Sequence, residues 1–139
     1  RKTPTVLDLA RGACVLYMVT TGIVYYILPY HLPDPNRIVW VNTILHLIAP
    51  IVGLFDWVFD PPKQNIPFKK TLLWLIFPLG YVIYSLLRGS LTNWYPYSFL
   101  NPTGPGGFQT VITYTIVISL GVVFGGFLIS KIGNFARNI

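Results

Sequence analysis

The sequence predicts an all-α fold, a polytopic bundle of four transmembrane helices in a single domain. Hydrophobic residues make up 53% of the 139 residues and charged residues only 10%, whereas soluble domains carry roughly a quarter charged residues. Four apolar segments each come close to the roughly 20 residues that a helix needs to cross the hydrocarbon of a bilayer. A backbone inside a membrane must satisfy its own hydrogen bonds, and the alternating pattern of barrel strands is missing, so these segments are expected to be helices.

The expected spans are joined by turn-rich connections. The spans cover residues of about 12–30, 38–59, 71–87 and 109–129. The connections are 31–36, 60–63 and 93–107, which carry the proline, glycine, asparagine and aspartate residues typical of turns. The chain 1–139 begins with Arg1 and Lys2 rather than methionine, so we expect it to start within a longer protein, with further spans upstream.

Basic residues lie mainly on one side of the expected spans. That side carries Arg1, Lys2, Arg11, Lys63, Lys69, Lys70, Lys131 and Arg137, and the other side only Arg37 and Arg88. The positive-inside rule assigns the basic side to the cytoplasm. We therefore expect a protein of the cell membrane with both ends of this chain cytoplasmic. The same placement accounts for the net charge of +6 without a nucleic-acid partner.

Small and polar residues line one face of the second span. At 100° per residue, an arc of roughly 80° contains Asn42, His46, Ala49, Gly53 and Asp56. Ionisable groups at membrane depth are costly, so they are usually retained for function. His46 and Asp56 are about 15 Å apart along the helix, which is too far for a direct bond.

His46 is the candidate catalytic residue. A neutral imidazole can take a proton from a hydroxyl nucleophile, and Asn42, one turn earlier, is expected to hold the ring or to polarise a carbonyl. The alternative is a structural histidine that forms hydrogen bonds across helices. The two interpretations are equally compatible with the sequence of the span.

The third span carries a similar stripe, which includes Pro78, Tyr81 and Arg88. Pro78 is expected to kink the helix and to free a backbone carbonyl. Arg88 is a candidate contact for an anionic headgroup or a substrate carboxylate, or else an anchor at the external surface. Tyr81, with Trp94 and Tyr95 of the following loop, completes the candidate substrate contacts. Interfacial packing is the alternative for the loop.

Two further features have structural interpretations. Asp56 lies near the cytoplasmic end of its span and is expected to be an anchor, salt-bridged to Lys69 and Lys70. In the fourth span, Gly121 and Gly125 form a G-x-x-x-G pair suited to close helix contact.

Several common chemistries lack their motifs in this sequence. The chain has two histidines and one cysteine, without an H-x-x-x-H pair, so no metal site is expected. Neither a G-x-S-x-G elbow nor a phosphate loop with its lysine is present. The sequence therefore predicts no cofactor.

Several motifs of the sequence resemble those of a known family. The matching elements are Asn42-x-x-x-His46 followed by Pro50, Asp56-Trp57 with Pro61-Pro62, the stretch 72–84 around Pro78, and the run R-G-x-L-T-x-W-Y-P-Y-x-F over 88–99. Over nearly the whole chain, they resemble the androgen-induced and androgen-dependent transmembrane proteins. The resemblance is closer still to the uncharacterised bacterial membrane relatives of these proteins. Its most specific part is the W-Y-P-Y-x-F loop.

The resemblance implies a six-helix membrane protein, of which this chain holds the last four spans. Animal members of the family are threonine hydrolases that cleave fatty acid esters of hydroxy fatty acids with a Thr and a His on different helices. His46 matches the family histidine. The matching threonine would lie on a helix before the first span, and Thr20, Thr21 and Thr43 are not at its position.

The sequence thus favours a hydrolase of lipid (fatty acyl) esters with His46 as the base and a threonine outside this chain as the nucleophile. The alternative is a non-catalytic subunit or scaffold that packs against other membrane proteins or lipid. Transport has less support, because the chain lacks a repeated half. A hydrolase requires a hydroxyl within hydrogen-bond reach of His46, in a pocket that admits an acyl chain. A scaffold predicts His46 bonded to backbone or to another buried side chain.

Overall fold

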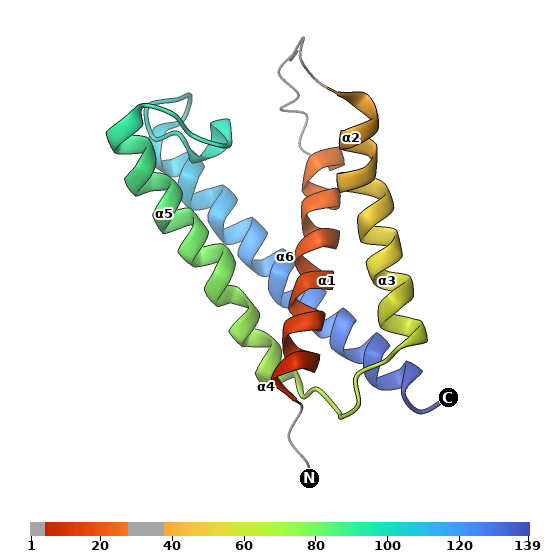
Figure 1. The fold of residues 1–139 in the computed structure, drawn as a ribbon. Coiled ribbons are helices and arrows are strands. Elements are labelled where there is room, and N and C mark those ends of the chain that lie inside the picture. The colour runs from red at the N-terminus through yellow and green to blue at the C-terminus, as the bar shows by residue number, and fades with distance from the viewer. Residues whose placement is uncertain (1–4, 28–37) are drawn as a thin grey trace.

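The computed structural model describes residues 5–27 and 38–139, and in that part of the chain it contains helices and no strand (Figure 1). The elements are α1 (Val6–Ile27), α2 (Val39–Thr43), the π-helical η1 (Ile44–Ile48), α3 (Ala49–Phe59), α4 (Phe68–Thr71), the 3₁₀-helical η2 (Leu72–Leu75), α5 (Ile76–Thr92), the 3₁₀-helical η3 (Ser98–Leu100) and α6 (Gly107–Ala136).

These elements join into four continuous helices long and apolar enough to cross a membrane. They are Val6–Ile27, Val39–Phe59, Phe68–Thr92 and Gly107–Ala136, with mean hydropathies of 1.4, 1.6, 1.5 and 2.2. The predicted all-α, four-span fold is thus confirmed, and the chain is a multi-pass membrane protein. Successive helices run in opposite directions, so α1 begins and α6 ends at the same end of the bundle (Figure 1).

The helices extend beyond the predicted apolar segments. The first begins at Val6 rather than near residue 12, and the third ends at Thr92 rather than near residue 87. A helix keeps its backbone hydrogen bonds beyond the hydrocarbon, so hydropathy marks the apolar part and not the helix end. The predicted end of the first span at 28–30 and the connection 31–36 lie outside the described residues.

The helix α1 occupies the middle of the bundle, where it packs against α3 and α6. The short α4 and η2 also pack against α6. From there, α5 diverges from α1 toward the opposite end of the bundle (Figure 1). The space between the diverging helices is where the candidate site lies.

The core of the bundle is built on a buried tryptophan that joins α3 to α6. Trp57 is fully buried, and its indole N–H donates a 2.9 Å hydrogen bond to the carbonyl of Ile129. Gly133 lies directly under the ring, because a Cβ at that position would be 2.6 Å from the indole nitrogen. The missing side chain of Gly133 is what lets α6 approach Trp57.

The predicted G-x-x-x-G pair makes only half of its expected contact. A Cβ on Gly125 would lie 2.6 Å from the Leu16 side chain on α1, but a Cβ on Gly121 would meet nothing within 4 Å. Further close contacts of α6 are made at Gly126 and Gly133. The seven-residue spacing of these two glycines places both on the same face of the helix.

The connection between α3 and α4 is fixed to α6 by a side-chain amide. Asn134 accepts a hydrogen bond from the backbone N–H of Ile66 and donates one to its carbonyl, both at 2.9 Å. Ile66 itself is 1% exposed. The connection is therefore packed as part of the bundle.

The substitution Gly133→Ala should destabilise the protein, because its Cβ would meet a buried aromatic ring that cannot move aside. We expect the free energy of unfolding to fall by about 1–3 kcal/mol, measured from thermal unfolding in detergent. The matched control is Gly121→Ala on the same helix, which has open space for its Cβ and should stay within about 1 kcal/mol of the native protein. Equal losses in both variants would contradict this account of the core.

Candidate functional site

A cavity of about 500 Å³ lies between α1, α5 and α6, and residues of the loop before α6 also line it. Its polar side chains include Thr20, Thr21, His46, Tyr81, Thr115 and Ser119, which come from four elements. Its apolar wall includes Phe77, Ile118 and Val122. Ligand pockets typically have volumes of about 300–1,000 Å³, so the cavity is large enough for part of a lipid.

His46 reaches this cavity from a local irregularity in its helix. Pro50 has no N–H to offer to the carbonyl of His46, four residues earlier, and its ring would clash with that carbonyl in a regular α-helix. The helix widens into the π-turn η1 directly before Pro50. Such turns are frequent at functional sites. The position of His46 thus follows from the Pro50 that comes one turn later.

α1 approaches η1 closely at Gly22. A Cβ on Gly22 would lie 2.5 Å from the carbonyl oxygen of His46 and 3.2 Å from the ring of Pro50. Another small residue on the predicted face, Gly53, meets Met18 of α1 in the same way, at 2.7 Å. The small face of the second span therefore packs against α1.

The hydrogen bond of the His46 ring determines which ring nitrogen is free. Nδ1 lies 3.0 Å from the backbone carbonyl of Asn42. A carbonyl only accepts hydrogen bonds, so in the neutral ring Nδ1 carries the proton and Nε2 keeps its lone pair. The ring also stacks on Tyr25, with centroids 3.9 Å apart and an interplanar angle of 15°. The imidazole is thus fixed in orientation, with Nε2 as its basic atom.

The side chain of Asn42 does not hold this ring. Its amide donates to the carbonyl of Ile38 at 3.2 Å, one turn back along its own helix. The residue does orient His46, but through its main chain. A polar side chain in a helix often bonds to the preceding turn. The sequence pattern therefore identified Asn42 but suggested its side-chain amide, whereas its backbone carbonyl contacts the ring.

No hydroxyl forms a hydrogen bond with His46 among the described residues. Thr21 and Thr43 donate instead to the backbone carbonyls of Tyr17 and Val39, at 2.8 and 3.0 Å. Thr115 has a buried hydroxyl that lacks any hydrogen-bond partner in the described part of the chain, His46 included. Within residues 5–27 and 38–139, His46 is therefore a candidate base without a paired nucleophile.

Thr115 and Ser119 were missed by sequence reasoning. They lie one helical turn apart and line the cavity together, a four-residue spacing that places two hydroxyls on one helix face. That spacing was visible in the sequence. Hydroxyl residues are common in membrane helices, however, so the spacing alone did not distinguish this face.

The predicted substrate contacts divide into two groups. Tyr81 lines the cavity, whereas Arg88, Trp94 and Tyr95 do not. The Arg88 guanidinium lies over the Trp94 ring, 4.7 Å from its centroid, and Tyr95 packs against Gly89. These contacts fix the loop to the end of α5.

Other residues of the same loop reach the cavity in their place, namely Pro96, Tyr97, Phe99 and Leu100. Burial raises the pKa of the Tyr97 phenol, and the nearby Tyr81 raises it further. Tyr97 therefore stays protonated at neutral pH and can donate a hydrogen bond into the cavity. The aromatic loop therefore does contribute to the cavity, but through Tyr97 and Phe99 rather than through the predicted Trp94 and Tyr95.

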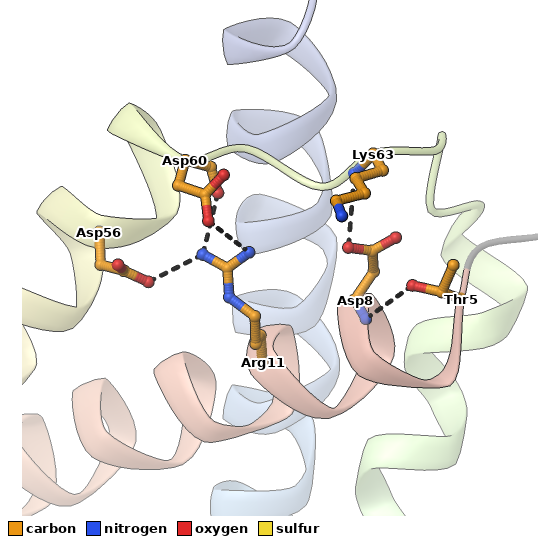
Figure 2. A network of polar contacts seen from close by, with 6 residues as sticks. All are labelled: Thr5, Asp8, Arg11, Asp56, Asp60 and Lys63. Atoms are coloured by element: carbon orange, nitrogen blue, oxygen red, sulfur yellow. Dashed lines mark hydrogen bonds and ion pairs between the residues drawn. The ribbon is translucent and has the colours of Figure 1, made fainter.

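Asp56 lies at the opposite end of the bundle and pairs with α1 rather than with α4. Its Oδ2 is 2.9 Å from Nη2 of Arg11 (Figure 2). The expected partners Lys69 and Lys70 lie beyond the connection that Asn134 fixes to α6. In the described part of the chain, Asp56 forms no ion pair with either lysine, and its carboxylate is taken by Arg11, so the predicted pairs are wrong.

Comparison with known protein families, with characterised proteins and with solved structures found no match. The resemblance to the androgen-induced transmembrane family therefore stays a prediction based on the motifs of the sequence. The described residues also contain no group of three or more His, Cys, Asp or Glu side chains placed to hold a metal ion.

The hydrogen bond to Asn42 predicts an unusual tautomer for His46. We expect ¹⁵N NMR of histidine-labelled protein in micelles to show Nδ1 protonated and Nε2 unprotonated in the neutral ring. The signal is assigned by its loss in His46→Gln and its retention in His31→Gln. Observation of the Nε2–H tautomer would contradict the geometry described for this site.

Proposed function

We propose that this chain forms part of a membrane-embedded hydrolase of lipid esters, with His46 as its general base. One observation carries the proposal: His46 lines a largely apolar cavity of about 500 Å³, and its Nδ1 lies 3.0 Å from the Asn42 carbonyl, which leaves Nε2 as the acceptor nitrogen of the neutral ring. A base that is oriented by a second group, inside a pocket of ligand size, is the arrangement that acyl transfer requires.

In this reaction, Nε2 of His46 takes the proton of a hydroxyl nucleophile as its oxygen attacks the ester carbonyl. The proton then passes to the departing alcohol oxygen, and the acyl group remains on the nucleophile oxygen. In the second half of the reaction Nε2 takes a proton from water as the water oxygen attacks the acyl carbonyl, and it returns this proton to the nucleophile oxygen as the fatty acid leaves. The nucleophile would be a threonine outside this chain, as the family resemblance implies. The acyl chain would lie along Phe77, Ile118 and Val122, which form the apolar wall.

The negative oxygen of the tetrahedral intermediate needs a hydrogen-bond donor. The Asn42 amide, which the sequence suggested for this role, is committed to the carbonyl of Ile38. The hydroxyls of Thr115 and Tyr97 are better placed, because both residues line the cavity and the Thr115 hydroxyl has no other partner in the described chain.

The second candidate is a non-catalytic membrane subunit or scaffold that binds lipid or other membrane proteins. It is favoured by the contacts of His46 itself, which bonds to backbone and stacks on Tyr25 without a hydroxyl partner among the described residues. In this case the cavity would hold a lipid chain that is not cleaved, and His46 would serve to fix the π-turn.

We further propose that the protein lies in the cell membrane with both ends of this chain in the cytoplasm. The described basic residues at the end where α1 begins and α6 ends are Arg11, Lys63, Lys69, Lys70, Lys131 and Arg137. Only Arg88 lies at the other end among the described residues. This asymmetry is what the positive-inside rule relates to orientation.

The hydrolase proposal predicts labelling by a fluorophosphonate probe that depends on the His46 side chain. In detergent, His46→Ala should lower the labelling rate of the full-length protein by about 10²–10⁴-fold, the usual contribution of a general base. Asn42→Ala is the matched control: it should retain labelling, because the backbone carbonyl that orients the ring remains. Circular dichroism and thermal unfolding would establish that both variants are folded.

Absence of labelling in the native protein would reject the proposed nucleophile and base, and would favour the scaffold. Labelling that survives in folded His46→Ala would contradict the role of His46 as base. Loss of labelling in both variants would show that the ring depends on the Asn42 side chain, contrary to the geometry.

A further inference from the structure

A second cavity, of about 470 Å³, lies at the end of the bundle where α1 begins and α3 ends, away from His46. The charged and polar residues of its lining are Thr5, Asp8, Arg11, Asp56, Asp60 and Lys63 (Figure 2). Because α1 and α3 are membrane spans, this cavity lies at the level where lipid headgroups meet the protein.

Arg11 engages two of the three carboxylates. Its Nη2 lies 2.9 Å from Oδ2 of Asp56 and donates to the backbone carbonyl of Asp60 at 2.9 Å. Its Nη1 lies 3.1 Å from Oδ2 of Asp60. The guanidinium is therefore occupied by α3 and the residue that follows it, and it makes no ion pair with the third carboxylate, Asp8.

Asp8 is a buried carboxylate with an unused oxygen. The residue is 2% exposed, and its backbone N–H donates to the hydroxyl of Thr5 at 3.2 Å, which caps α1. Its Oδ1 accepts one long hydrogen bond, 3.4 Å, from the backbone N–H of Lys63. Its Oδ2 is buried with no hydrogen-bond partner in the described part of the chain. A buried carboxylate oxygen without a donor is costly, so this atom indicates a missing cationic or donor group.

Lys63 supplies the opposite charge in the same cavity. Its main chain contacts Asp8, but the ammonium of its exposed side chain makes no ion pair or hydrogen bond with any described residue. The cavity thus contains a carboxylate oxygen of Asp8 that can accept from a cation and a Lys63 ammonium that can bind an anion. These two groups form no ion pair with each other. A metal ion is a poor match, because two of the three carboxylates are paired with Arg11 and no three acidic, histidine or cysteine side chains among the described residues are placed to hold one ion.

We propose that this cavity binds the phosphoethanolamine headgroup of a membrane lipid. The primary ammonium of the lipid donates to Oδ2 of Asp8, and the phosphate pairs with the ammonium of Lys63. A choline headgroup has no N–H and cannot make the first bond, and a glycerol headgroup brings no positive charge. The proposal is independent of whether His46 is catalytic, since the two cavities are separate.

Thermal unfolding in maltoside detergent tests the proposal with short-chain lipids added at equal concentrations. Because a ligand of the native state stabilises it, dihexanoyl phosphatidylethanolamine should raise the unfolding midpoint more than the matching phosphatidylcholine or phosphatidylglycerol. Asp8→Asn should remove this preference and weaken apparent binding of the ethanolamine lipid about tenfold, since a charge-assisted hydrogen bond is lost. Asp60→Asn is the matched control and should keep the preference, because Asp60 is already paired with Arg11.

Lys63→Gln provides a second variant should Asp8→Asn fail to fold, because the exposed side chain of Lys63 has no structural contact to lose. It should reduce the binding of phosphatidylethanolamine, through the lost phosphate contact. Equal shifts with all three lipids, a preference that survives in folded Asp8→Asn, or unchanged binding of phosphatidylethanolamine by Lys63→Gln would each overturn the proposal. An equal shift with soluble phosphoethanolamine would overturn the assignment to a lipid and would indicate a soluble zwitterion instead.

Discussion

The packing of the bundle depends on the indole of Trp57, which joins its own helix α3 to both α1 and α6. Its N–H bonds to α6 at Ile129, its ring covers Gly133, and a Cβ on Gly12 of α1 would lie 3.1 Å from its edge. The Arg11 guanidinium lies 5.8 Å from the ring centroid while it pairs with the adjacent Asp56. Inside a membrane, lipid tails are as apolar as the helices, so close packing and interhelical hydrogen bonds must hold the spans together. Asp56 and Trp57 supply both kinds of contact from neighbouring positions.

Two prolines determine the local geometry on either side of α1. Each leaves a carbonyl four residues earlier without its helical donor. For Pro78 this carbonyl belongs to Trp74, and it accepts a 2.7 Å hydrogen bond from the hydroxyl of Tyr17. For Pro50 it belongs to His46, and the helix answers with a π-turn that Gly22 accommodates. Because both irregularities face α1, the residues around them come together at the cavity.

The sequence predicted those features that depend on one helix at a time. Hydropathy and length located all four spans, and the small face of the second span does meet α1 through His46, Gly53 and Asp56. Features that depend on how the helices are placed were not predictable in the same way. The partner of Asp56 is Arg11 from another span, and no local pattern distinguishes it from Lys69. The open side of Gly121 and the positions of Trp94 and Tyr95 outside the cavity likewise depend on the angle at which helices and loop meet.

The bonds from α6 to Trp57 and Ile66 also set an order for biosynthesis. Each joins residues separated by about 70 positions, 72 for Trp57 with Ile129 and 68 for Ile66 with Asn134. Because a chain is made from its N-terminus, the first three spans of this segment are synthesised before the partners of these polar groups exist. Until then, the indole N–H of Trp57 and the peptide group of Ile66 lack the partners that they have in the complete fold. Completion of the last span therefore closes the fold, because only then can these two polar groups find their partners.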